Sequence, residues 1–279
     1  MKKVEFFSVS RLKFVAILCL LTCFITTCTK PNQRSIEELT SCYAELGNNH
    51  QLGLNCILEN LKVVNSTSVE ELKLNQLFKE VQKSSVAFTI EKLGLDISAE
   101  NDLLRIQEAM KSSLTKSSID LSIIEMTNGQ IPLTSNEIRY LSKLDVILAS
   151  VSNGIDQCIN NIRNLEYEIF SSCSSEEIDF LFTATSIGVN SVEYWYYNYE
   201  IWEEELQIPE LIDKKGIAHK EWFWSSLSRM GRMDIVGGIT GAALGAFAGG
   251  VGAIPGALSG ACLASGNCGI MCLYEHLTE

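Results

Sequence analysis

The chain has 279 residues and carries 22 Lys and Arg against 34 Asp and Glu, a formal net charge of −12 at pH 7. Such an acidic chain repels the phosphates of nucleic acids and is not attracted to anionic membrane surfaces, so we expect no nucleic-acid function. About 200 residues lie between the two apolar ends of the chain, roughly enough for one domain with a sizeable core or two small ones.

The first 27 residues have the organisation of an export signal. A basic start precedes an apolar stretch at 14–25, which is too short to span a bilayer. The basic residues are Lys2, Lys3, Arg11 and Lys13. Without residues 1–27 the chain keeps 18 basic and 33 acidic residues, a net charge of −15.

This signal ends in Ile25, Thr26, Thr27 and Cys28. The ending resembles the lipobox of bacterial lipoproteins, in which an aliphatic residue and two small residues precede a cysteine. The resemblance implies that the chain is cleaved after Thr27 and that Cys28 carries lipid, although that family usually has Gly, Ala or Ser in place of Thr27. Cys23 is a weaker competitor, and a plain cleaved signal or an uncleaved anchor is the alternative.

Seven cysteines follow the expected lipidation site, and an exported chain meets an oxidising compartment in which disulfides are permitted. They are Cys42, Cys56, Cys158, Cys173, Cys262, Cys268 and Cys272. Cys42 and Cys56 flank residues 47–50, a predicted turn between two short helices, and could face one another. Cys158 and Cys173 are predicted on one helix, roughly 22 Å apart and too far for a direct bridge. Because the number is odd, at least one cysteine stays outside any disulfide. For each cysteine the alternative to a disulfide is a buried free thiol.

The stretch 28–230 is predicted to be an acidic bundle of six to eight helices. Serines followed by acidic residues, which favour helix N-termini, recur along it. They are Ser35, Ser68, Ser98, Ser135 and Ser174. Apolar residues follow at helical spacing, and we expect long helices near 134–170 and 175–206.

All four tryptophans lie between residues 195 and 224. Trp195, Tyr199 and Trp202 share one helical face, which predicts core packing. The segment 222–232 carries three aromatic residues followed by two arginines. That order is compatible with an interfacial membrane belt, and equally with a soluble helical core.

No catalytic or metal-binding constellation is found. Ser113 and Lys116 match the spacing of a Ser-x-x-Lys motif, but the other elements of such enzymes do not follow. His50, His219 and His276 are too scattered for a metal motif. We therefore predict no catalytic residue, no metal ligand, no cofactor and no enzymatic activity.

The sharpest feature is an uncharged run at 235–274 in which glycines recur every four residues. The glycines are Gly237, Gly241, Gly245 and Gly249, then Gly252, Gly256 and Gly260. Each set lines one face of a helix without side chains, and such faces allow close helix packing, especially in lipid. We predict two helices joined by a Gly-rich turn, with Pro255 in the first turn of the second helix and Asp234 and Glu275 as the polar limits.

This hairpin resembles the glycine-zipper segments of bacterial envelope lipoproteins and the Gly/Ala-rich helices of membrane-permeabilising bacteriocins. The whole chain is similar to a group of uncharacterised Gram-negative lipoproteins with a helical body and a C-terminal glycine-zipper hairpin. The expected fold is all-α: a signal at 1–27, a multi-helix bundle at 28–230, and a Gly/Ala-rich helical hairpin at 231–279. A hairpin packed on the bundle in water is the alternative to a hairpin in lipid.

The function that follows is that of a non-enzymatic envelope lipoprotein with a structural or interaction role, attached to the outer membrane through Cys28 and the hairpin. Its expected partners are membrane lipid, an envelope protein of unknown identity, and a second copy where the hairpin self-associates. The alternative is a secreted membrane-active protein of the pore-forming or bacteriocin type.

Overall fold

The computed structural model describes residues 34–64, 70–110, 121–127, 130–206, 217–247 and 251–278. These residues form nine α-helices and one 3-10 turn and contain no strand, which confirms the all-α prediction. The elements are α2 (Ile36–Val64), α3 (Glu70–Leu93), α4 (Ala99–Met110), α5 (Ile123–Thr127), α6 (Ser135–Ala149), η4 (Val151–Asn153), α7 (Ile155–Ser172), α8 (Ser175–Glu205), α9 (Ile217–Phe247) and α10 (Ala253–Thr278). The signal, Cys28 and Gly249 lie outside the described residues.

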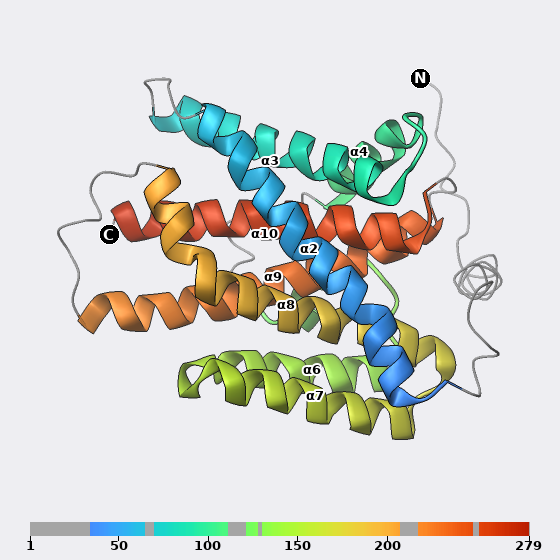
Figure 1. Ribbon diagram of the computed structural model, residues 1–279. Coiled ribbons are helices and arrows are strands. Elements are labelled where there is room, and N and C mark those ends of the chain that lie inside the picture. The colour runs from blue at the N-terminus through green and yellow to red at the C-terminus, as the bar shows by residue number, and fades with distance from the viewer. Residues whose placement is uncertain are drawn as a thin grey trace, which may run out of the picture.

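The glycine hairpin α9–α10 lies in the middle of the bundle (Figure 1). Helices α3 and α4 lie on one side of it, and α8 lies on the other. Helices α6 and α7 pack beyond α8, while α2 crosses α8, α10 and α3. The domain boundary expected at residue 231 falls inside α9. Because α9 and α10 contact α2, α3, α4 and α8, the hairpin forms part of the core of the bundle and is not a separate domain.

Several helices begin where the sequence places them, because a local side chain satisfies their first N–H groups. Ser174 accepts a hydrogen bond from the backbone N–H of Glu177, whose carboxylate accepts one from the backbone of Ser174. The same reciprocal pair starts α6, although its capping residue is Thr134, one position before the expected Ser135.

Helix α2 departs from the expected pair of short helices. It is continuous for 29 residues and passes through the predicted turn at 47–50. A Cβ atom added to Gly47 would lie 2.0 Å from Nδ2 of Asn190 on α8, so this glycine permits a close helix crossing. Cys42 and Cys56 are 14 residues apart on one helix, about 21 Å, and do not face one another.

The prediction of one long helix near 134–170 is also wrong. Helix α6 ends at Ala149, and α7 begins at Ile155 after the short η4 turn. Gly154 has φ = 130°, in the region that only glycine adopts readily, and it reverses the chain so that α6 and α7 pack as a pair. The expected helix at 175–206 is confirmed as α8.

The predicted aromatic core is confirmed. Trp195 and Trp202 are fully buried and Tyr199 is 1 % exposed. The Trp202 Nε1–H donates to the Tyr194 hydroxyl at 2.9 Å, and that hydroxyl donates to Asn55 of α2 at 3.0 Å. The Trp202 indole and the Tyr194 phenol therefore keep hydrogen-bond partners at the junction of α2 and α8, whereas the buried Tyr199 hydroxyl has none among the described residues.

Among the described helices, α10 alone is long and apolar enough to cross a membrane by length and composition. In its most apolar window, 94 % of the residues are buried inside the protein.

The two residues expected to mark the polar limits of the uncharged run have different surroundings. Asp234 is completely buried, so it does not mark a surface boundary, whereas Glu275 is partly exposed and pairs with Arg229 at 3.1 Å.

Candidate functional site

The glycine faces of α9 and α10 meet backbone to backbone. A Cβ atom at Gly241 would lie 2.2 Å from the carbonyl oxygen of Gly256, and one at Gly245 would lie 2.4 Å from that of Gly252. At the next contact, a Cβ at Gly260 would lie 2.3 Å from the carbonyl oxygen of Gly237. No side chain fits at these contacts, so the four-residue rhythm has a direct structural cause.

Other glycines bring α10 against its remaining neighbours. A Cβ at Gly269 would lie 2.2 Å from the Trp195 ring on α8, and one at Gly266 would lie 2.7 Å from Val81 on α3. Gly53 of α2 makes the same close approach to Cys262 of α10. Glycine therefore serves the packing of α10 on several sides, which explains why it can be so thoroughly enclosed.

A polar cluster lies buried where four helices converge. Oδ2 of Asp234 on α9 accepts hydrogen bonds from Ser191 of α8 at 2.5 Å and from Ser265 of α10 at 2.6 Å. Ser265 also accepts the indole N–H of Trp195 at 2.9 Å. Nε2 of His50 on α2 lies 3.6 Å from the same Asp234 oxygen, and both side chains are completely buried.

Burial shifts the two titrating groups of this cluster in opposite directions. It raises the pKa of Asp234 from 3.8 to about 7, although the Ser191 and Ser265 hydroxyls favour the ionised carboxylate and lower it in part. Burial lowers the pKa of His50 from 6.5 to about 4. Both groups are therefore driven toward their uncharged forms, which is how a low-dielectric interior accommodates ionisable side chains.

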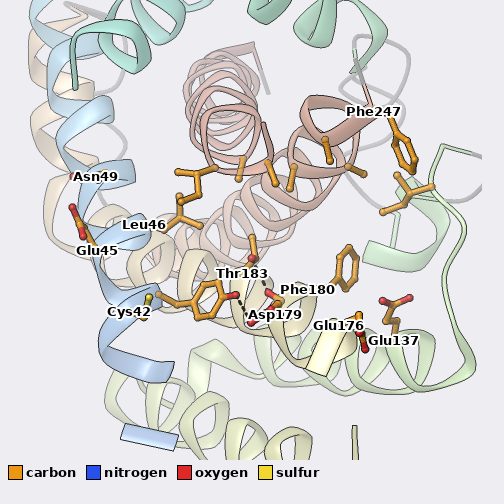
Figure 2. A pocket seen from close by; sticks show the side chains of 18 of the residues that line it. Cys42, Glu45, Leu46, Asn49, Glu137, Glu176, Asp179, Phe180, Thr183 and Phe247 are labelled. Carbon is orange, nitrogen blue, oxygen red and sulfur yellow. Dashed lines mark hydrogen bonds between the residues drawn. The ribbon is translucent and has the colours of Figure 1, made fainter. Parts of the chain in front are cut away.

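A cavity of about 400 Å³ opens at the tip of the hairpin. Figure 2 shows Leu46 on α2 beside the hairpin helices, with Asp179, Thr183 and Phe180 of α8 facing them across the cavity. Phe247, the last residue of α9, lies at one end. The hairpin contributes small apolar side chains: Ala242, Ala243, Ala246, Ala253, Ile254 and Ala257. The lining is mostly apolar, as is common in small-molecule sites.

The charged residues of the cavity are mainly acidic. Asp179 is already paired, because its Oδ1 accepts from Arg34 at 3.1 Å and from the Tyr43 hydroxyl at 2.7 Å. Glu45, Glu137 and Glu176 also line the cavity. Because Arg34 and Asp179 neutralise one another, these three glutamates leave the cavity negatively charged.

The segment 222–232 packs within the protein. Phe223 lies edge-on to Tyr199 of α8, with ring centroids 5.6 Å apart, and Trp224 stacks on Tyr196. Arg232 contacts Asp145 of α6 at 2.8 Å, and Arg229 contacts Glu275. Both arginines therefore have acidic partners within the protein, so of the two alternatives the contacts favour the helical core.

None of the seven cysteines in the described residues forms a disulfide. Cys42 is exposed, Cys56 and Cys173 are partly buried, and the other four are buried. The sulfur atoms of Cys268 and Cys272 lie 3.9 Å apart, one turn apart on α10. Cys158 lies on α7, whereas Cys173 is the extended residue that follows the last helical residue, Ser172, so the two do not share one helix as expected.

The structure brings five of the seven predicted packing glycines together on the facing helices: Gly237, Gly241, Gly245, Gly256 and Gly260. Gly252 instead lies in the turn before α10 with φ = 87°, where a Cβ would meet nothing within 4 Å, and it contributes only its carbonyl oxygen to the contact with Gly245. Gly249 and Cys28 lie outside the described residues. The His50–Asp234 cluster was missed, since these residues are 184 positions apart and belong to no local motif. The cavity was missed for the same reason. No group of three His, Cys, Asp or Glu in the described ranges is placed to hold a metal ion.

Comparison of the chain with protein-family models, curated proteins and solved structures finds no match.

Proposed function

We propose that the protein is a non-enzymatic lipoprotein of the bacterial outer membrane, held by lipid on Cys28 and resting against the bilayer with the tip of its glycine hairpin. Its role is structural or that of an interaction module. The observation that carries the proposal is that the start of the described chain and the hairpin tip lie at the same cavity. Arg34 and Ala253 both line it.

Chain length supports this arrangement. Cys28 precedes Arg34 by six residues, which span at most about 21 Å when extended. A lipid on Cys28 therefore lies within reach of the hairpin tip. Two weak membrane contacts at one end of the molecule give stable attachment where one acyl anchor alone is marginal.

The hairpin tip is the part of the hairpin that supports contact with lipid. Phe247 is 44 % exposed, and Leu244, Val251 and Ile254 are partly exposed, whereas Ile239 and Leu258, farther from the turn, are completely buried. No charged residue lies between Ile235 and Tyr274. We therefore propose that the tip enters the bilayer surface while the rest of the hairpin stays inside the bundle.

The test uses the mature chain with Cys28→Ser, so that the tip acts without the lipid. Replacing Phe247 with Glu should weaken binding to phosphatidylcholine vesicles about tenfold. The side chain is 44 % exposed, and burying its exposed part in an apolar phase contributes roughly 1.4 kcal/mol. Flotation of the vesicles measures the bound fraction. Lipid on Cys28 is tested separately by acyl labelling of the wild type and the Cys28→Ser variant in cells.

Tyr197→Glu is the matched control. Tyr197 is an aromatic residue of α8 that is 65 % exposed, and it lies 14 residues beyond the last α8 residue at the cavity, Thr183. Its substitution should leave vesicle binding unchanged. Equal losses in the two variants, or none in Phe247→Glu, would contradict contact through the tip.

A second candidate, a membrane-active protein, is favoured by one observation: an uncharged helical hairpin enclosed by other helices. In that case vesicles should release the hairpin and expose Cys262, Cys268 and Cys272, which are buried in the bundle. Maleimide labelling of these three cysteines together with dye release from vesicles measures this, and Cys158 of α7 is the internal control. Protection of all four thiols and no leakage at micromolar protein would eliminate this candidate.

A further inference from the structure

The cavity at the hairpin tip combines an apolar wall with an acidic rim. The apolar wall comes from the small side chains of α9 and α10, with Leu46 and Phe180 from α2 and α8. A volume of about 400 Å³ falls within the range of cavities that bind small molecules. This arrangement accommodates the apolar body of a small ligand.

The rim determines the charge of that ligand. Glu137 and Glu176 lie close to Phe180 at one end of the cavity, and Glu45 lies on α2 (Figure 2). Burial raises the pKa of Glu137, and the nearby Glu177 raises it further. Glu137 and Glu177 therefore repel one another, and a cation beside Glu137 would offset both that repulsion and the cost of burying the Glu137 carboxylate.

We propose that this cavity binds a single-chain amphiphile with an ammonium head group. Its alkyl chain lies along the alanines of the hairpin, and its ammonium group lies between Glu137 and Glu176. A fatty acid or a phospholipid is disfavoured, because its carboxylate or phosphate would face the same glutamates. The proposal rests on the cavity and is independent of the membrane role of the tip.

Titration calorimetry on the mature chain with Cys28→Ser tests the charge preference with three probes of equal chain length, each below its micellisation concentration. Decylammonium should bind at least tenfold more tightly than decanol, and decanoate should bind most weakly. Decanoate binding as tight as decylammonium, or no detectable binding of decylammonium, would overturn the proposal.

Two sets of variants locate the site. Ala243→Trp fills the cavity and should weaken decylammonium and decanol alike by at least tenfold. Glu137→Gln with Glu176→Gln should reduce decylammonium to the affinity of decanol and leave decanol unchanged. Glutamine at position 137 can still accept the capping hydrogen bond from Thr134, so α6 keeps its start.

The matched control is Glu200→Gln with Glu204→Gln, which removes two exposed charges near the other end of α8. It should not change the affinity for decylammonium. Urea unfolding confirms that each variant is folded, and Ala246→Leu replaces Ala243→Trp if the larger side chain unfolds the bundle. Unchanged binding in the folded cavity variant, or an equal loss in the Glu200/Glu204 control, would place the amphiphile elsewhere and overturn the proposal.

Discussion

Replacing Gly241 with alanine is expected to destabilise the whole bundle by about 2 kcal/mol. The added Cβ would lie 2.2 Å from the carbonyl oxygen of Gly256, and backbone atoms cannot move aside as the end of a flexible side chain can. Overpacking of this kind costs about 3 kcal/mol, and the better helix propensity of alanine offsets up to about 1 kcal/mol. The urea midpoint, followed by tryptophan fluorescence, measures the change.

Gly231→Ala is the matched control, since Gly231 also lies on α9. A Cβ there would meet only side-chain atoms, with Cδ2 of Leu148 at 3.2 Å and Cγ2 of Val192 at 3.4 Å. These methyl groups can shift by a few tenths of an ångström, so we expect stability within about 0.5 kcal/mol of the wild type. If Gly241→Ala were as stable as Gly231→Ala, the close backbone contact between α9 and α10 would be contradicted.

The second large effect concerns the dependence of stability on pH. Between about pH 4 and 6.5 the buried pair holds one proton, on Asp234, because the pKa of Asp234 is about 7 and that of His50 is about 4. The unfolded chain also holds one proton over this range, on His50. Since the proton count is equal in both states, the pair should contribute almost no pH dependence to the free energy of unfolding.

Each single variant should reveal one half of this cancellation. Asp234→Asn leaves His50, whose lowered pKa contributes stability above pH 6.5 that is lost as the pH falls to about 4, on the order of 3 kcal/mol. His50→Gln leaves Asp234, whose raised pKa contributes stability below pH 3.8 that is lost as the pH rises to about 7, on the order of 4 kcal/mol.

The measurement is the free energy of unfolding of each variant minus that of the wild type, from urea curves between pH 4 and 8. The subtraction cancels the titration of the other carboxylates. At pH 8 the wild type holds an ionised, buried Asp234, so Asp234→Asn should be the more stable protein, because its amide oxygen can still accept from Ser191 and Ser265. Slopes of the same sign in the two variants would refute the opposed pKa shifts.

Much of the local structure followed from the sequence. The capping serine at 174 and the shared face of Trp195, Tyr199 and Trp202 depend on neighbours within a few turns, and both are found as predicted. Pro255 lies in the first turn of α10, and the spacing of Gly241 and Gly245 correctly indicated close helix packing. These features rely on helical periodicity, which a single sequence contains.

Other predictions were wrong because glycine can either end a helix or allow two helices to pack closely. Gly47 lies in a segment that was predicted to be a turn, because glycine lowers helix propensity. In the structure it lets α2 approach Asn190 of α8, and α2 remains continuous. At Gly154 the same residue type does reverse the chain, with φ = 130°. The difference lies in what faces each glycine, which sequence periodicity does not contain.

The sequence by itself determined that the chain is helical, that it ends in a glycine-faced hairpin, and that Trp195 is buried. The tertiary structure alone decided that other helices surround the hairpin, that a cavity opens at its tip, and that Asp234 is buried beside His50. An uncharged helix can bury its surface in lipid or in protein. An aspartate such as Asp234 can mark the polar end of an apolar segment at the surface, or it can be buried among hydrogen-bond donors. Each choice depends on partners from distant parts of the chain, such as Ser191 and Ser265, which meet Asp234 only when α8, α9 and α10 pack together.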